Sequence, residues 1–150
     1  MAVQYVMHLG ICVRDLERSI RFYRDGLAFE EAGELKIAGE PTATLVEVPG
    51  LALHAVYLER DGIRIELLHY SSPGTVGNAE RRPMNQPGLT HLALRVDDLD
   101  ETIAKLTPLG ATILEHTRIY DEKFESHIIY ITDPDGTRLE IIEVPNDPTR

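Results

Sequence analysis

The stretch that decides the fold runs from His8 to Ile20 and reads HLGICVRDLERSI. It recurs 83 residues later, at His91–Ile103, as HLALRVDDLDETI. A second stretch, DGIRIELL at Asp61–Leu68, recurs 74 residues later, at Asp135–Ile142, as DGTRLEII. The repeat predicts two copies of one unit, each with a His on its first strand and a Glu on its last.

The bulk composition is typical of a soluble globular protein. The chain has 150 residues, of which 43% are hydrophobic and 27% charged, and this length suits a single domain with a real core. The formal net charge of −10 argues against nucleic acid or an anionic membrane as a partner, because both require clustered Lys and Arg.

The sequence also favours a cytoplasmic protein. The single cysteine, Cys12, cannot form an internal disulfide, which is typical of a reducing compartment, and we expect it in the core as a small apolar residue. No segment approaches the ~18–20 apolar residues needed to span a bilayer. The N-terminus lacks the basic region and cleavage site of a signal peptide.

The hydrophobic pattern predicts the order β-α-β-β-β in each half. Asp15 and Asp98 are expected to cap helices whose apolar residues recur at helical spacing. The expected strands are Tyr5–Val13, Phe29–Ile37, Leu53–Glu59 and Ile63–His69, then Leu89–Val96, Thr112–Arg118, His127–Thr132 and Thr137–Val144. The pattern leaves the segment 40–50 undecided.

We expect an α+β protein of two such modules. The first module is placed at residues 3–70, a connecting loop at 71–87 and the second module at 88–145, all within one domain over residues 1–150. Neither half alone, at ~60–70 residues, would bury much core.

Strand parity places the repeated His and Glu on the sheet face away from the helix. Side chains two apart on a strand share a face, and the apolar neighbours of Glu66 and Glu140 take the helix side. His8 and His91 are likewise opposite in parity to the apolar residues of their strands. Burying carboxylates beside imidazoles costs several kcal/mol unless the charge is neutralised. The sequence therefore predicts one divalent metal ion with His8, Glu66, His91 and Glu140 as its ligands.

Two arginines repeat on the same face. Arg64 and Arg138 match across the repeat and share the parity of the ligands. They could pair with acidic groups or bind an anionic substrate, and the sequence alone leaves both alternatives open.

The paired modules, the two opening stretches and the closing YITDPDGTRLEIIE resemble the vicinal oxygen chelate superfamily, which contains glyoxalase I, methylmalonyl-CoA epimerase, extradiol dioxygenases, and the fosfomycin and bleomycin resistance proteins. The resemblance implies curved mixed sheets around a metal cleft, with the helices outside. It also implies a homodimer and a small-molecule substrate with oxygens on neighbouring carbons. Two His and two Glu resemble the ligand set of glyoxalase I, with Zn, Ni, Co, Mn or Fe(II) as the ion.

The reaction implied by this resemblance is that of a lyase or isomerase. A proton next to a carbonyl is removed, and the metal stabilises the enediolate or enolate that forms. Glu140 or Glu66 would act as the base, with Glu140 favoured. The alternatives are an iron(II) ring-cleaving dioxygenase that uses His8, His91 and Glu140, and a small-molecule-binding resistance protein without turnover.

Overall fold

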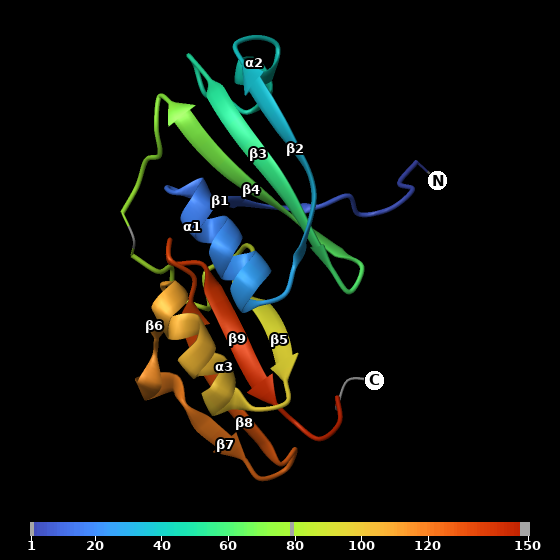
Figure 1. Ribbon diagram of the computed structural model, residues 1–150, viewed down its shortest axis with the longest axis vertical. Coiled ribbons are helices and arrows are strands. Elements are labelled where there is room, and N and C mark those ends of the chain that lie inside the picture. Colours follow the sequence, from blue (N-terminus) through green and yellow to red (C-terminus); the bar gives the residue numbers. More distant parts are fainter. Residues whose placement is uncertain (1, 79, 148–150) are drawn as a thin grey trace. The chain divides into compact units, whose positions relative to one another are not determined.

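The computed structural model describes residues 2–78 and 80–147, which divide into two compact units, Met1–Gly77 and Asn78–Arg150. Each unit holds one mixed β-sheet with a helix packed on one face (Figure 1). The expected α+β class is confirmed, and neither sheet closes on itself. No helix in the described part of the chain is long and apolar enough to cross a membrane.

The first unit has the expected order β-α-β-β-β with one short helix added. Its sheet order is β1-β4-β3-β2, in which β1 runs parallel to β4 and the other neighbours are antiparallel. The elements are β1 (Leu9–Cys12), α1 (Leu16–Arg21), a π-helical turn (Phe22–Gly26), β2 (Glu30–Ala38), α2 (Thr42–Leu45), β3 (Ala52–Arg60) and β4 (Ile63–Ser72).

The helix of the first unit begins and packs as its sequence predicts. The Asp15 side chain accepts a hydrogen bond from the backbone N–H of Arg18 at 2.9 Å and caps α1. The apolar stripe continues through the π-helical turn, where Phe22 and Tyr23 are fully buried. Ile65 and Leu67 of β4 are also fully buried, so these strand residues and the helix stripe form the core.

The second unit repeats this plan with two interruptions. Its sheet order is β5-β9-β8-β6, with β7 also paired to β8. The elements are β5 (Leu92–Val96), α3 (Leu99–Leu106), a 3-10 turn (Thr107–Leu109), β6 (Thr112–Ile113), a second 3-10 turn (Glu115–Thr117), β7 (Ile119–Asp121), β8 (Ser126–Thr132) and β9 (Arg138–Glu143).

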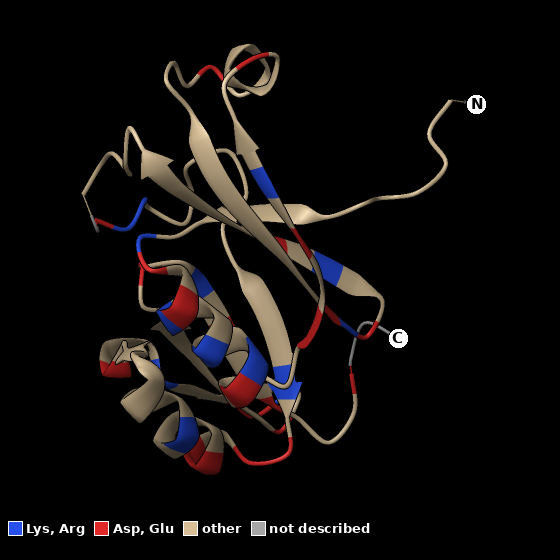
Figure 2. Ribbon diagram, turned by 45° about the horizontal axis from the view of Figure 1, so that its top comes forward, with Lys and Arg blue, Asp and Glu red and all other residues tan. Residues whose placement is uncertain are grey.

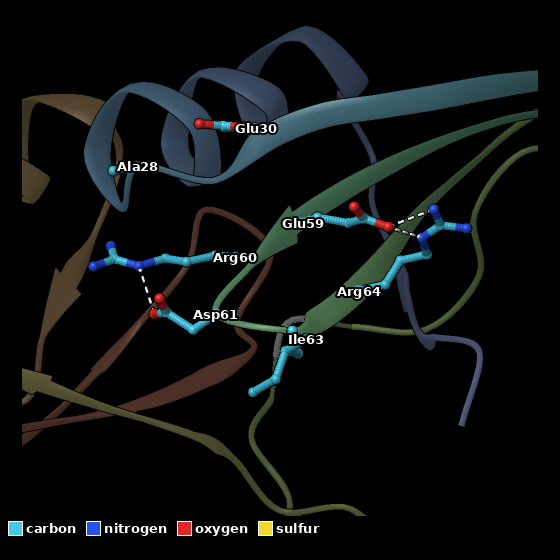
Figure 3. Close-up of a pocket in the computed structure, with 8 residues that line it drawn as sticks. Ala28, Glu30, Glu59, Arg60, Asp61, Ile63 and Arg64 are labelled. Carbon is cyan, nitrogen blue, oxygen red and sulfur yellow. Dashed lines mark hydrogen bonds and ion pairs between the residues drawn. The ribbon is translucent and has the colours of Figure 1, made fainter. Parts of the chain in front are cut away.

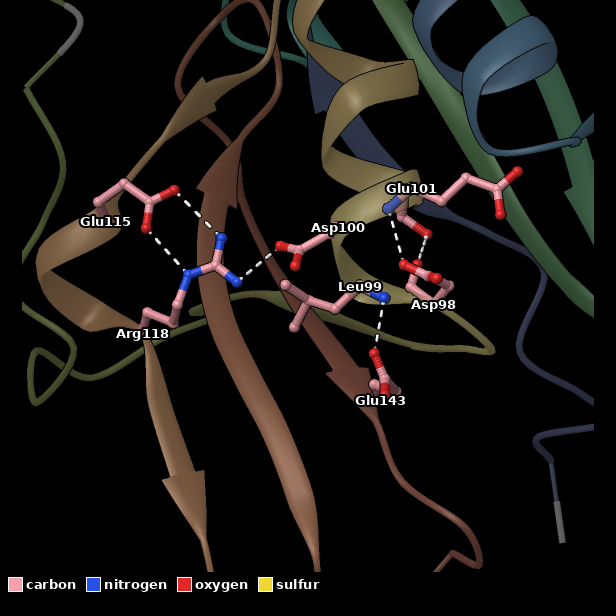
Figure 4. A network of polar contacts seen from close by, with 8 residues as sticks. Asp98, Leu99, Asp100, Glu101, Glu115, Arg118 and Glu143 are labelled. Atoms are coloured by element: carbon pink, nitrogen blue, oxygen red, sulfur yellow. Dashed lines mark hydrogen bonds and ion pairs between the residues drawn. The ribbon is translucent and has the colours of Figure 1, made fainter.

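Carboxylates hold the start of α3 (Figure 4). The Asp98 side chain accepts from the backbone N–H of Glu101 at 2.8 Å, as the sequence predicts for an N-cap. A second carboxylate, that of Glu143 at the end of β9, accepts from the backbone N–H of Leu99 at 2.8 Å. The first turn of α3 is therefore hydrogen-bonded to β9, the last strand of the sheet.

The structure differs from the predicted strands where side chains compete for backbone groups. The predicted strand Thr112–Arg118 is interrupted after Ile113, because the Thr117 hydroxyl donates to the carbonyl of Leu114 and accepts from the N–H of Tyr130. A side chain thus replaces a strand partner and forms a turn.

The first predicted strand, Tyr5–Val13, is also too long. Leu9 pairs with Ile65 in the parallel register, and β4 begins at Ile63. The neighbouring strand therefore provides few backbone hydrogen-bond partners for the residues before Leu9. The segment left undecided by the sequence contains the short helix α2.

Helices α1 and α3 each carry acidic residues in the first turn and basic residues in the last turn. Lys and Arg lie among Asp and Glu along α1 and α3 (Figure 2). The exposed sides of these two helices therefore carry no cationic stripe of the kind that binds a phosphate backbone.

Truncating the core next to a candidate ligand should destabilise the fold. Leu67→Ala removes a side chain with 0% exposure, and we expect the free energy of unfolding in urea to fall by about 2–5 kcal/mol. Leu45→Ala is the matched control, since Leu45 is 80% exposed and its loss should change the unfolding free energy by less than about 0.5 kcal/mol. Equal effects of the two variants would contradict this assignment of the core.

Candidate metal centre

The first unit brings His8 and Glu66 together. His8 directly precedes β1, and Glu66 lies on the neighbouring parallel strand opposite Gly10. The two side chains point to the face away from α1, and His8 Nε2 lies 3.1 Å from Glu66 Oε2. A Cβ at Gly10 would lie 3.2 Å from Leu68 Cδ1 and 4.0 Å from Glu66 Oε2. The glycine therefore leaves the carboxylate accessible on that side.

A tyrosine completes this first pair. Tyr57 lies opposite Glu66 in the β3–β4 ladder, and its hydroxyl donates to Glu66 Oε1 at 2.6 Å. This hydrogen bond and, after it, burial raise the pKa of Tyr57 to about 12. The phenol ring also meets the His8 imidazole edge to face, at 5.6 Å between centroids. Glu66 is thus held between a phenol on one oxygen and an imidazole on the other.

The second unit repeats the pair and its tyrosine. His91 Nε2 lies 3.1 Å from Glu140 Oε2, and Tyr130 lies opposite Glu140 in the β8–β9 ladder. The His91 and Tyr130 rings meet edge to face at 5.5 Å. The pKa of Tyr130 is raised, chiefly by burial and then by the charge of Glu140. The repeat seen in the sequence is therefore a repeat of side-chain geometry.

The two pairs differ in how their imidazoles are held. Nδ1 of His91 lies 2.8 Å from the Thr90 hydroxyl oxygen, a contact that lets Nδ1–H donate and leaves the Nε2 lone pair available. Nδ1 of His8 is buried without a hydrogen-bond partner in the described part of the chain. His91 is therefore the better-oriented of the two imidazoles.

The spacing within each pair fits two ligands of one metal ion. A nitrogen and an oxygen ligand, each about 2.1 Å from a metal and at a right angle to one another, lie about 3.0 Å apart. Both observed separations are 3.1 Å. The side chains are partly accessible, with exposed fractions of 32% for His8, 14% for Glu66, 27% for His91 and 20% for Glu140.

Each unit by itself supplies two donors. Over residues 2–78 and 80–147, no three His, Cys, Asp or Glu side chains group closely enough to hold a metal ion. The donors occur as two pairs, so the four-ligand centre stays a prediction.

The ligand face of the first sheet has an apolar neighbourhood. The segment around α2 forms a small core of Ala43, Leu51 and Leu53. Leu68 and Tyr70, on the same strand as Glu66, are half-buried and pack against this core.

The expectation of a buried Cys12 is wrong, because Cys12 is exposed on the ligand face of the first sheet. Strand parity accounts for it, since Cys12 is four residues from His8.

The repeated arginines make different contacts. Arg64 forms an ion pair with Glu59, and its guanidinium lies 5.6 Å from the centre of the Tyr57 ring. Arg138 instead donates to the backbone carbonyl of Arg82 at 2.6 Å. Arg64 therefore follows the first of the two alternatives, pairing with an acidic group.

Arg64 also lines a hollow of about 500 Å³ at the β3–β4 turn (Figure 3). Figure 3 shows two ion pairs in its wall, Glu59 with Arg64 and Arg60 with Asp61. Glu30 also lines the hollow, so three carboxylates face two guanidinium groups and the hollow has no excess of positive charge to attract an anionic ligand.

The pH dependence of the Tyr57 contact can be predicted. The folded-state pKa of about 12 lies above the value near 10 of an unfolded chain. The stability that this contact contributes is present in full below pH ~10 and is lost as the pH rises towards about 12. Wild type should therefore lose its stability advantage over Tyr57→Phe across that window, measured by urea unfolding. A difference that stays constant with pH would contradict the contact.

Comparison with known proteins gives the class of the chain. The profile of the glyoxalase/bleomycin resistance protein/dioxygenase superfamily matches residues 5–141. The chain therefore belongs to this superfamily, the vicinal oxygen chelate proteins, which includes metal-dependent enzymes.

Individual relatives agree with this class. The chain is 33% identical over 142 residues to the metallothiol transferase FosB of Lysinibacillus sphaericus (strain C3-41), which covers 93% of this chain and 82% of the relative. It is 31% identical to the metallothiol transferase FosB of Staphylococcus epidermidis, covering 94% of this chain and 82% of the relative. The crystal structure of a glyoxalase family protein from Bacillus cereus matches with a TM-score of 0.79, covering 97% of this chain and 99% of that one. At 21% identity, this last likeness concerns the fold.

Proposed function

We propose that the protein is a metal-dependent lyase or isomerase of the glyoxalase type. Its centre would be one divalent ion (Zn, Ni, Co, Mn or Fe(II)) held by His8, Glu66, His91 and Glu140. The observation that carries the proposal is the recurrence of one His–Glu pair, at the same 3.1 Å separation, in both units. One such pair is an ordinary surface contact, but two matching pairs would supply the four donors of a single centre.

The donor set is consistent with a divalent cation. Two neutral imidazoles and two carboxylates give zero net charge with a doubly charged ion, which removes the cost of leaving half-buried carboxylates unneutralised. Mixed nitrogen and oxygen donors accept several first-row metals. The expected substrate is a small molecule with oxygens on neighbouring carbons.

The residues of the chain would divide the chemistry between them. The bound ion would supply a Lewis acid that stabilises negative charge on a substrate oxygen. Glu140 would take the proton from the carbon next to the carbonyl and return it, to the adjacent carbon in one reaction type or to the same carbon in the other. Glu66 would remain bound beside His8.

The relatives favour a second candidate, metal-dependent thiol transfer. Two relatives above 30% identity are named metallothiol transferases, and the same four donors could hold the metal for that reaction. Thiol transfer would form a carbon–sulfur bond without removing a carbon-bound hydrogen, whereas the lyase or isomerase reaction removes the hydrogen next to a carbonyl and returns it. Incorporation of deuterium from heavy water at that carbon by the metal-loaded protein therefore separates the two reactions.

The two remaining alternatives have less support. A ring-cleaving dioxygenase would need Glu66 off the metal, yet this carboxylate is held beside His8 by Tyr57. Oxygen consumption by iron-loaded protein in the presence of catechols would support the dioxygenase alternative. A binding protein without turnover has no need of four metal donors, but tight ligand binding by metal-free protein would support it.

The first experiment is metal analysis of protein purified without added metal. About one divalent ion per chain is expected, and removal by a chelator should abolish turnover. Protein that carries no metal and binds none of the five ions would overturn the proposal.

We propose a homodimer as the assembly, and mixed variants can test whether two copies share a centre. His8→Ala and His91→Ala each remove one donor. If the donors come from two copies, mixing the two variants under exchange conditions restores one intact centre per dimer. If they come from one chain, the mixture binds no more metal than either variant alone.

A further inference from the structure

The two carboxylates of the proposed centre are not held alike. Glu66 has both oxygens engaged, because Oε1 accepts from the Tyr57 hydroxyl at 2.6 Å and Oε2 lies 3.1 Å from His8 Nε2. A carboxylate fixed in this way can offer only Oε2 to a metal. Its rotation would break a short hydrogen bond.

Tyr57 is itself firmly placed. Its backbone lies directly opposite Glu66 in an antiparallel ladder, its ring meets the His8 imidazole at 5.6 Å, and the Arg64 guanidinium lies 5.6 Å from the ring centre. Arg64 is in turn paired with Glu59. The hydroxyl therefore has little freedom to follow Glu66 if the carboxylate moves.

Glu140 is held more weakly by its tyrosine. It has the same register partner, Tyr130, and the same separation from its imidazole. Tyr130 also hydrogen-bonds Glu140, but this bond raises the pKa of Tyr130 less than burial and charge do, whereas the 2.6 Å bond to Glu66 is the largest cause of the raised pKa of Tyr57. On the imidazole side of the second pair, Nδ1 of His91 contacts the Thr90 hydroxyl.

We propose that Tyr57 is a positioning residue that keeps Glu66 as a permanent, single-oxygen metal ligand, and that Glu140 is consequently the carboxylate free to leave the metal and carry the proton. The inference rests on the proposed metal centre and gives a structural reason why Glu66 stays on the metal while Glu140 transfers the proton. Tyr57 acts through Glu66 and touches neither metal nor substrate.

The test compares Tyr57→Phe with Tyr130→Phe, which remove the same atom from matching positions. Metal affinity is measured by competition with a chromophoric chelator, using Zn²⁺ as the probe. Tyr57→Phe should bind Zn²⁺ about 10–100-fold more weakly than wild type, the usual cost of losing a hydrogen bond to a ligand. Tyr130→Phe should change the affinity far less. Equal affinities for the two variants would overturn the inference.

A double variant separates positioning from a general structural effect. If Tyr57 acts only through Glu66, adding Tyr57→Phe to Glu66→Gln should leave the Zn²⁺ affinity unchanged. A further full loss in the double variant would refute the assignment. Wild-type protein that binds no Zn²⁺ would instead overturn the proposed function itself, so the two failures are distinguishable.

A second comparison leaves Tyr57 intact in case Tyr57→Phe does not fold. Glu66→Gln should weaken Zn²⁺ binding more than Glu140→Gln, because only Glu66 is a permanent ligand. Equal losses, or a larger loss for Glu140→Gln, would contradict the inference. Circular dichroism of the metal-free variants checks that each is folded.

Discussion

Protein with His91→Ala is expected to lose stoichiometric metal binding. His91 supplies the better-oriented imidazole, since Thr90 holds its Nδ1 and leaves Nε2 directed towards Glu140. Loss of a hydrogen bond to a ligand alone costs about 10–100-fold in metal affinity, so loss of the ligand should cost more than about 100-fold. Metal analysis after gel filtration and chelator competition measure this effect.

The control for this variant is His116→Ala. His116 is an exposed residue of a 3-10 turn and has no counterpart in the first unit, so its loss should leave the metal content at the wild-type level. If His91→Ala retained the full metal content while His116→Ala lost it, the assignment of the second His–Glu pair would be wrong.

Glu140→Gln is expected to abolish turnover while much of the metal is retained. An amide has nearly the same shape as a carboxylate and can still contact a metal, but it cannot accept a proton at neutral pH. Removal of a general base typically costs 10²–10⁴-fold in rate, and we expect a loss of about that size in kcat. Single-turnover kinetics with the metal-loaded variant provide the measurement.

Exchange of substrate hydrogen with solvent gives an independent measurement of the same step. Wild type should incorporate deuterium from heavy water at the carbon next to the carbonyl, and Glu140→Gln should not. Full turnover by Glu140→Gln would show that another group is the base. Glu66→Gln is the matched control, because it should lose metal rather than proton transfer on the metal that remains.

The sequence predicts the plan of each unit because apolar periodicity and turn residues are local signals. Asp15 and Asp98 cap their helices as expected, and strand parity places His8 beside Glu66 and His91 beside Glu140. Strand ends are less predictable because they depend on where the neighbouring strand begins. Thr117 breaks a predicted strand through a hydrogen bond to distant Tyr130, which no local pattern reveals.

Sequence reasoning missed the tyrosines for a related reason. Tyr57 and Tyr130 both precede the Asp-Gly turn that leads to the ligand strand, but their spacing of 73 residues (130 − 57) is one short of the 74-residue repeat of that strand. Their role depends on the hairpin register, which sets each tyrosine opposite its Glu. The difference between the two contacts depends on how the side chains are placed in the folded protein. Periodicity carries no such information.

The anchoring of β9 determines how Glu140 can move. This strand is bonded on both sides, to β5 and β8. The carboxylate of its last residue, Glu143, accepts a hydrogen bond from the backbone N–H of Leu99 at the start of α3. Just beyond the strand, the Arg95 guanidinium donates to the backbone carbonyls of Val144 and Pro145. Any excursion of the Glu140 carboxylate is therefore a rotation about its own side-chain bonds on a stationary backbone. Such rotations take nanoseconds or less where the side chain is accessible, so proton delivery need not wait for a slow rearrangement of the sheet.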